Sequence, residues 1–226
     1  MKTLVIAAHP DDEVLGCGGT IGRLAQQGQE VHIAILGEGI TSRYQERQNA
    51  DAELIKSLKR CASQVARELG ATELYLFEFP DNRFDSVPLL EIVHTIEELV
   101  RRVQPTTIYT HHNGDLNIDH SVTHRAVLTA TRPIQGQPVK EIYAFEVPSS
   151  TEWAFQQLEQ PFRPNTFVDI TATLELKIKG MALYESEARA FPHPRSTEAL
   201  RAIAQRWGSV VGCQATEAFQ LIRAIR

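Results

Sequence analysis

The sequence predicts an α/β protein with a Rossmann-like, three-layer fold, in which helices cover both faces of a mostly parallel sheet. Three observations lead to this prediction. Short apolar runs, such as residues 2–8 and 31–36, alternate with longer stretches of helical periodicity. The connections between them are short, as in folds built from successive strand–helix units. Several of the strand-like runs end directly in polar turns, which is where open α/β sheets place their ligands.

The first half of the chain alternates strand and helix regularly. The apolar runs carry few polar residues, as expected of strands that are buried on both faces. Two of the helical patterns end at a glycine, Gly28 and Gly70. The expected elements are strands at 2–8, 31–36, 74–79 and 106–110, helices at 21–27, 45–69, 89–103 and 121–130, and a loop at 40–44.

Beyond Pro133 the pattern is looser. Ser196 is the expected N-cap of the last helix, and residues 217–225 are too few to decide between strand and helix. The other expected elements are strands at 141–147 and 166–170, a loop at 148–164, and helices at 174–184 and 198–210. With neither an internal repeat nor a linker in view, the 226 residues predict a single domain over 1–226.

The composition restricts the classes of partner. A formal net charge of −5 gives no electrostatic reason to expect nucleic acid or an anionic membrane as a partner. No apolar run approaches the ~20 residues of a transmembrane helix, and the first residues lack the hydrophobic stretch of a secretory signal. Three widely separated cysteines do not form a disulfide framework. We therefore expect a cytoplasmic protein that has no transmembrane segment and acts on a small molecule.

A histidine and three acidic residues follow the first expected strand. They lie in the string HPDDE at residues 9–13, just before the glycine-rich GCGG at 16–19. An imidazole nitrogen and carboxylate oxygens suit a divalent metal such as zinc. One of Asp11 and Asp12 would bind the metal while the other holds the water it activates, and the spacing does not say which. A turn that merely places acids at a helix start is the alternative.

A catalytic zinc needs about three protein ligands, so a further histidine is expected from elsewhere in the chain. His120 and His124, four residues apart, share one face of the expected helix after residue 120. Both are candidates on spacing alone, and the Asp119-His120 pair, which opens the helix, favours His120.

The strings AHPDDE at 8–13, GCGGT at 16–20 and DH at 119–120 resemble the signature of the PIG-L/LmbE-like family of zinc-dependent N-deacetylases. These enzymes act mostly on N-acetylglucosamine-type sugars. The resemblance implies a metal-dependent amidohydrolase that removes an acetyl or other short acyl group from the amide nitrogen of such a sugar or glycoconjugate. It also implies one Zn²⁺ per chain and a homo-oligomer, a trimer or hexamer.

The resemblance assigns roles to the metal-site residues. His9, Asp12 and His120 would hold the zinc, and Asp11 would be the general base for the water that the zinc activates. Asp119 would orient a ligand or a catalytic group from behind.

Asn117 departs from the family pattern. Many members have a histidine at this position, which stabilises the tetrahedral intermediate or protonates the amine. An amide can donate a hydrogen bond to an oxyanion but cannot shuttle a proton, so another residue is the acid or Asp11 takes and returns the proton. His193, between two prolines, is a second candidate for acid or oxyanion donor if its loop folds over the zinc. A plain turn position is the alternative for both.

Substrate contacts are predicted from loops at the same end of the sheet. Arg43 and Asp81 match, weakly, where the family places its sugar contacts. Arg195 would face an anionic group on the substrate, and His124 is expected to be packed or substrate-facing. An ordinary surface charge is the alternative reading for the charged residues.

Other classes of protein fit less well. A dinucleotide-binding oxidoreductase would need GxGxxG, which the order of glycines at 16–19 does not provide. A phosphatase would favour two close metal ions, and the histidines supply one good site. The remaining alternative is a metal-retaining sugar-binding protein with little or no catalysis.

Overall fold

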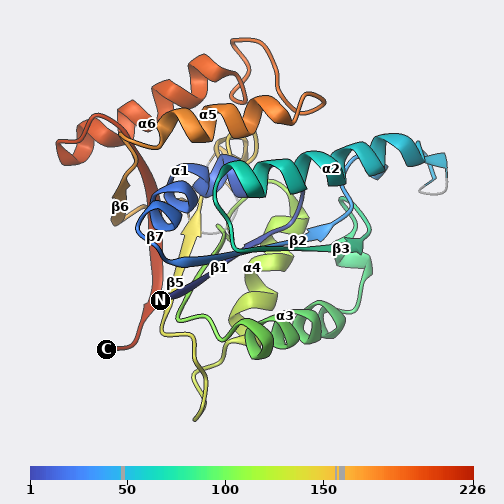
Figure 1. Ribbon diagram of the computed structural model, residues 1–226. Coiled ribbons are helices and arrows are strands. Elements are labelled where there is room, and N and C mark those ends of the chain that lie inside the picture. The colour runs from blue at the N-terminus through green and yellow to red at the C-terminus, as the bar shows by residue number, and fades with distance from the viewer. Residues whose placement is uncertain (47–48, 156, 158–160) are drawn as a thin grey trace.

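The computed structural model describes residues 1–46, 49–155, 157 and 161–226 (Figure 1). Its centre is a seven-stranded sheet in the order β3-β2-β1-β4-β5-β7-β6. The first five of these strands are parallel, and β7 is antiparallel to both β5 and β6. The strands are β1 (Lys2–Ala7), β2 (Glu30–Gly37), β3 (Glu73–Phe79), β4 (Thr107–His111), β5 (Glu141–Phe145), β6 (Thr166–Asp169) and β7 (Thr216–Ala224).

Helices cover both faces of the sheet, so the predicted three-layer α/β fold is confirmed. The α-helices are α1 (Asp12–Gln26), α2 (Ala52–Glu68), α3 (Leu89–Val103), α4 (Ile118–Ala130), α5 (Leu174–Leu183) and α6 (Thr197–Val211). Helices α1, α2, α5 and α6 pack on one face, and α3 and α4 on the other (Figure 1). Because strand side chains alternate, Val5 points into the first core and Leu4 into the second.

The strand order creates the place for a ligand. Strand β1 lies between β2 and β4. From β1 the chain adds β2 and β3 on one side, and from β4 it adds β5 on the other, so the strand order reverses between β1 and β4. In open α/β sheets the crevice outside the carboxyl ends of such a pair is where ligands bind. The polar segments that follow β1 and β4 therefore meet at this switch point.

Helix α1 begins earlier than its sequence indicates. A helix was expected at 21–27, but α1 starts at Asp12 and continues through the glycine-rich stretch, with non-helical backbone at Cys17. Glycines allow this because α1 lies very close to its neighbours. A Cβ at Gly16 would clash with the ring of Phe145, and one at Gly19 would lie 2.8 Å from Ile170.

A buried ion pair stabilises the break in α1. The carboxylate of Glu217 accepts hydrogen bonds from the amides of Gly19 and Thr20, which begin the second half of the helix. Lys177 donates to Glu217 and to the carbonyl of Leu15, which ends the first half. The pair thus binds the free amides and a free carbonyl that the break leaves in a buried helix.

Other boundaries also differ from expectation. Residues 217–225 belong to a strand, β7, because they pair with both β5 and β6. The helix expected at 45–69 begins at Ala52, where Asp51 caps it, and residues 47–48 of that range lie outside the described residues. The loop expected at 148–164 contains a short 3-10 helix, η4 (Glu152–Ala154), and its residues 156 and 158–160 lie outside the described part of the chain.

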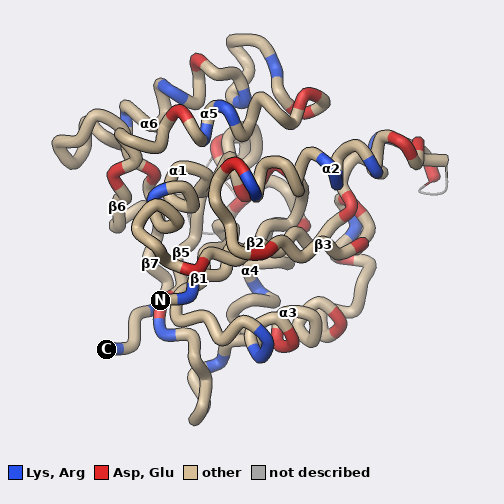
Figure 2. The backbone as a smooth tube through the Cα atoms, viewed as in Figure 1, with Lys and Arg blue, Asp and Glu red and all other residues tan. Residues whose placement is uncertain are grey.

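The outer helices carry charges of both signs. Figure 2 shows acidic and basic residues interspersed along α2, α3 and α5, so these helices present no single-sign stripe. Within the described residues, none of the helices has both the length and the apolar character that crossing a membrane requires.

We expect Gly16→Ala to lower the free energy of unfolding by about 1–3 kcal/mol, because overpacking forces the Phe145 ring or the backbone to move. Gly180→Ala is the matched control. A Cβ there would make ordinary contacts of 3.5 Å or more, and alanine favours a helix interior by up to about 1 kcal/mol. Guanidinium unfolding of both variants measures the difference. Equal stability of the two would contradict the close approach of α1 to the sheet.

Candidate active site

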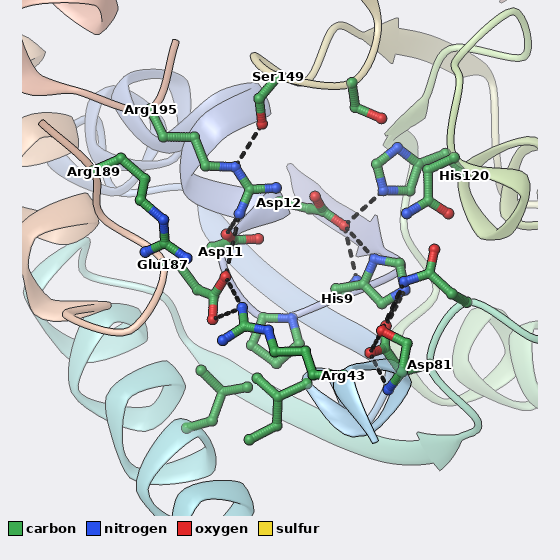
Figure 3. A pocket seen from close by; sticks show the side chains of 18 of the residues that line it. His9, Asp11, Asp12, Arg43, Asp81, His120, Ser149, Glu187, Arg189 and Arg195 are labelled. Atoms are coloured by element: carbon green, nitrogen blue, oxygen red, sulfur yellow. Dashed lines mark hydrogen bonds and ion pairs between the residues drawn. The ribbon is translucent and has the colours of Figure 1, made fainter. Parts of the chain in front are cut away.

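A cavity of about 300 Å³ opens at the carboxyl ends of the parallel strands (Figure 3). Nine residues that the sequence singled out line it, namely His9, Asp11, Asp12, Arg43, Asp81, Asn117, His120, His193 and Arg195. They come from loops and from the first turns of α1 and α4, far apart in the chain, and the sheet topology brings them to one edge. Asp119 lies directly behind the cavity, in contact with His9.

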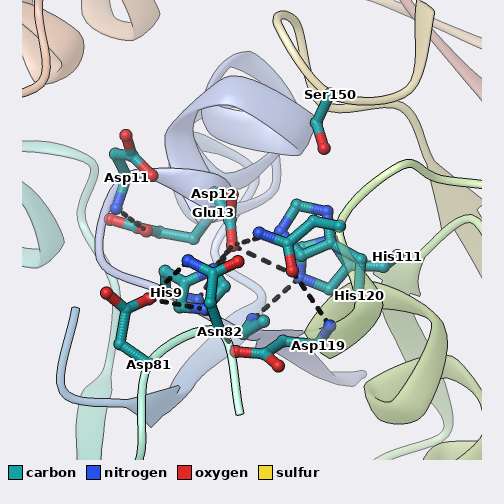
Figure 4. Close-up of polar contacts among 12 residues, drawn as sticks. His9, Asp11, Asp12, Glu13, Asp81, Asn82, His111, Asp119, His120 and Ser150 are labelled. Atoms are coloured by element: carbon teal, nitrogen blue, oxygen red, sulfur yellow. Dashed lines mark hydrogen bonds and ion pairs between the residues drawn. The ribbon is translucent and has the colours of Figure 1, made fainter. Parts of the chain in front are cut away.

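His9, Asp12 and His120 form a compact group at the inner end of the cavity (Figure 4). Oδ2 of Asp12 is 3.3 Å from Nδ1 of His9 and 3.2 Å from Nε2 of His120. All three residues are buried, and Nε2 of His120 makes no hydrogen bond to any described residue. A buried nitrogen without a hydrogen bond, facing a carboxylate and a second imidazole, fits a metal ligand.

The other nitrogen of His9 faces a second pair of carboxylates. Its Nε2 is 2.9 Å from Oδ2 of Asp119 and 3.2 Å from Oδ1 of Asp81. Burial alone would lower the pKa of His9, but hydrogen bonds with Asp119 and Asp12 hold this pKa well above its usual value. This position fits the role expected of Asp119, because a carboxylate on the far nitrogen orients a metal-binding imidazole.

Asp115 is a site residue that the sequence analysis missed. Its Oδ1 lies 3.1 Å from Nδ1 of His120, and it also accepts hydrogen bonds from Ser150, Thr151 and the amide of Asn117. Burial raises the pKa of Asp115, but His120 and these donors outweigh burial and lower it to about 2. The signal in the sequence that could have identified Asp115 is its place in the polar segment before His120, which contains a second acid besides Asp119.

His111 fixes the ring of His120 from the other side. The two imidazoles stack with their centroids 3.9 Å apart. Nε2 of His111 accepts a hydrogen bond from the amide of Ala8, and burial holds the pKa of His111 well below its usual value. His111 is therefore a neutral ring that packs against the metal-site histidine.

The turn that carries Asp11 is strained. Asp11 has φ 107°, a left-handed value that non-glycine residues rarely adopt. Its amide donates to Oε2 of Glu13 at 3.0 Å, and the hydroxyl of Tyr184 donates to Oε1 of Glu13 at 2.6 Å. Burial raises the pKa of Glu13 to about 7. Glu13 and Tyr184 thus hold the backbone of Asp11 in place.

Strained backbone is concentrated around the cavity. Of the six non-glycine residues with positive φ among the described residues, Asp11, Ile40, Asn82 and Ser149 line it. Such conformations cost about 1–3 kcal/mol each and gather at functional sites, where the surrounding structure imposes them.

Arg195 lines the cavity, as expected of a residue that faces the substrate, and it also contacts the predicted base, which the sequence did not indicate. Its guanidinium donates to Oδ2 of Asp11 at 2.6 Å and to Oγ of Ser149 at 2.7 Å (Figure 3). Burial raises the pKa of Asp11 and Arg195 lowers it, and the net effect leaves this pKa well above its usual range. The sequence could not show this pairing, because 184 positions separate the two residues.

His124 does not share the cavity with the other predicted residues. Its Nδ1 bonds to the carbonyl of His111 at 2.8 Å, and it lines a separate hollow with Arg125 and Leu128. Of the two expectations for His124, packed or substrate-facing, the structure agrees with the packed one. It lies one helical turn beyond His120, and that turn carries it past the cavity.

Asn117, Asp81 and His193 are each held by hydrogen bonds from other residues of the protein. Oδ1 of Asn117 caps α4 by accepting from the amide of Asp119. Asp81 accepts hydrogen bonds from the amide and hydroxyl of Ser42. Nδ1 of His193 accepts from the amide of Arg195, so its ring proton is on Nε2.

The fold and the site together define an α/β protein with a buried His–Asp–His group that could hold a metal ion at the switch point of its sheet. The chain belongs to the PIG-L family, described as GlcNAc-PI de-N-acetylase, whose model matches residues 4–131, more than half of the chain. The description of the family names hydrolysis of an amide C–N bond.

Three individual relatives share between 23% and 28% sequence identity with this chain. The chain is 28% identical over 158 residues to the uncharacterized deacetylase YaiS of Escherichia coli, covering 65% of this chain and 74% of YaiS. It is also 28% identical over 193 residues to 4-oxalmesaconate hydratase of Pseudomonas putida, covering 78% and 70%. Among solved structures, N,N′-diacetylchitobiose deacetylase from Pyrococcus horikoshii has a TM-score of 0.77 at 23% identity, over 98% of this chain and 84% of that one.

We expect Zn²⁺ to stabilise the metal-free protein, by about 2.7 kcal/mol when the free ion is at 100 times its Kd. Asp12→Asn should abolish this stabilisation because it removes the carboxylate between His9 and His120. Asp81→Asn should keep most of it, since Asp81 faces the other nitrogen of His9. Thermal unfolding with and without zinc measures both. The opposite pattern would place the ion between His9, Asp81 and Asp119.

Proposed function

We propose that the protein is a zinc-dependent hydrolase that removes an acetyl or other short acyl group from the amide nitrogen of an N-acetylglucosamine-type sugar or conjugate. The observation that carries the proposal is the convergence of His9, Asp12 and His120 beside Asp11 in one cavity. The description of the family, a de-N-acetylase of a GlcNAc conjugate, supports the same substrate class.

Three residues would hold the metal. The donor set of two imidazoles and one carboxylate is common in catalytic zinc sites, which keep a further position open. A zinc ion bound there would supply Lewis-acid polarisation of the amide carbonyl and would lower the pKa of a water molecule to about 7. Asp119 and Asp115 keep the imidazoles of His9 and His120 in the orientation that binding requires.

Asp11 is the general base in this proposal. Arg195 occupies its Oδ2, which leaves Oδ1 to accept the proton of the attacking water. Burial raises the pKa of Asp11, although Arg195 opposes the change, and a carboxylate with a raised pKa is a stronger base near neutral pH. Asn117 cannot carry a proton, and His193 in this proposal binds the oxyanion as a neutral ring. Asp11 therefore also returns the proton to the departing amine.

His193 is the better of the two candidates for binding the oxyanion. Its Nδ1 is occupied by the amide of Arg195, so Nε2–H is the group left to donate a hydrogen bond. Burial, together with Arg195 and Arg189, lowers the pKa of His193, so the ring donates as a neutral imidazole. Asn117 contributes through its amide nitrogen, because its oxygen caps α4.

Arg43 and Asp81 remain the proposed sugar contacts. Both line the cavity. Half of the Arg43 side chain is exposed, so it can donate to a hydroxyl group. Asp81 already accepts from Ser42, so a sugar hydroxyl would share its carboxylate.

A second candidate function is the addition of water to a carbon–carbon double bond in a polycarboxylate. The relative named 4-oxalmesaconate hydratase is as similar in identity as the deacetylase YaiS. Three arginines, Arg43, Arg189 and Arg195, line the cavity and would suit an anionic substrate. Acetate release from N-acetylglucosaminides, set against loss of the ultraviolet absorbance of 4-oxalmesaconate, distinguishes the two.

We expect Asp11→Asn to reduce acetate release by at least about 10²-fold, the lower range for a lost general base, while zinc content stays at one ion per chain. Released acetate and metal analysis of the same sample measure both. Loss of zinc in this variant would show that Asp11 and Asp12 have exchanged roles.

Separate substitutions should identify the oxyanion donor. His193→Ala should lower kcat by about 10²–10³-fold, the typical cost of one such donor. Asn117→Ser keeps an oxygen that can cap α4 and should lower kcat less. Steady-state kinetics on a substrate that the wild type deacetylates gives the comparison. A larger loss in Asn117→Ser, at unchanged thermal stability, would assign the role to Asn117 instead.

A further inference from the structure

Glu187 is a buried carboxylate between two arginines of the cavity, and sequence analysis alone assigns it no role (Figure 3). We propose that Glu187 is a positioning residue that holds Arg43 towards the substrate and Arg195 against the base Asp11. This inference rests on the proposed function, because it takes Arg43 as a substrate contact and Asp11 as the general base.

Glu187 contacts both Arg43 and Arg195. Nη2 of Arg43 lies 2.7 Å from each of its carboxylate oxygens. Nη1 of Arg195 lies 3.4 Å from Oε2 and 2.6 Å from Oδ2 of Asp11. The charges thus alternate along the cavity wall, in the order Arg43, Glu187, Arg195, Asp11.

Glu187 is the fixed member of this set. Its side chain is 8% exposed, against 48% for Arg43 and 21% for Arg195. Its amide donates to the carbonyl of Tyr184 at 2.8 Å, and Tyr184 is fully buried and bonded to Glu13. Glu187 is therefore anchored to the same residues that hold the strained backbone of Asp11.

A fixed carboxylate restricts both arginines. A free arginine side chain has about 2 kcal/mol of rotamer entropy to lose when it binds. Contact with Glu187 removes part of that freedom before substrate arrives, which is how preorganisation improves binding and orientation. On the other side, Arg195 fixes one oxygen of Asp11 and so sets the direction of the other.

Glu187 itself is not placed to react. Both of its oxygens already accept from arginines, and Ser186 donates to Oε1 as well. It acts through Arg43 and Arg195, so its removal should change KM through the first and kcat through the second. A purely structural ion pair would change neither.

The test compares Glu187→Gln with Glu175→Gln, the same chemical change in an exposed carboxylate that pairs with Arg201 on α6. The zinc-loaded full chain is assayed for acetate release from N,N′-diacetylchitobiose and from p-nitrophenyl N-acetyl-β-glucosaminide. We expect Glu187→Gln to lower kcat/KM by about 10- to 100-fold, the range that a small misplacement causes. Glu175→Gln should remain within twofold of wild type, as for a surface ion pair.

Double-mutant cycles show through which arginine Glu187 acts. In an Arg195→Met background, Glu187→Gln should no longer lower kcat. In an Arg43→Met background it should no longer raise KM. Losses that simply multiply in both backgrounds would overturn the proposal, as would a Glu187→Gln variant that behaves like Glu175→Gln.

A readout without substrate separates this inference from the proposed function. In NMR spectra of the arginine Nε–H groups, we expect the Arg43 and Arg195 signals to broaden or shift in Glu187→Gln, while those of other arginines stay in place. Unchanged signals would overturn the positioning role whether or not either sugar is deacetylated.

If Glu187→Gln does not fold, Glu187→Asp is the second variant. It keeps the charge but is too short to reach both arginines, and the same losses are expected. A wild type that releases no acetate from either sugar would count against the proposed function alone.

Discussion

The buried group of imidazoles and carboxylates at the switch point of the sheet is the interaction on which the rest of the structure depends. His9, Asp12 and His120 are all buried, and burying charged groups is costly unless they are paired or bind a metal. Asp115 and Asp119 add two more carboxylates behind the imidazoles. Such a group favours a positive charge at its centre, and a divalent cation supplies it more fully than a proton can.

The cavity is lined by residues from inside and from outside the part of the chain that the family model matches. The family match covers residues 4–131, which include every candidate metal ligand. Ser149, Glu187, His193 and Arg195 come from beyond that range and line the same cavity. The residues that could hold a metal are thus in the matched part, while the second part supplies the arginine that contacts Asp11 and much of the cavity lining. This division agrees with a family whose relatives carry different names for their reactions.

Backbone strain and close packing support the same arrangement. Asp11 adopts its left-handed conformation because Glu13 and Tyr184 hold its backbone. Helix α1 can start directly after this turn because its glycines let it lie against Phe145 and Ile170. The rigid scaffold therefore ends in a turn whose side chains have little freedom, which suits groups that must meet a substrate in one geometry.

By itself the sequence determined the α/β class, most of the elements and the metal-site string, because periodicity, caps and short motifs are local properties of the chain. Only the tertiary structure decided what depends on contacts between distant residues. It paired Arg195 with Asp11 across 184 positions and Arg43 with Glu187 across 144, and it added Asp115 while moving His124 out of the cavity. Strand β7 likewise became recognisable only through its partners β5 and β6. Local patterns say where a side chain leaves the backbone, whereas the packing of the layers decides what it meets.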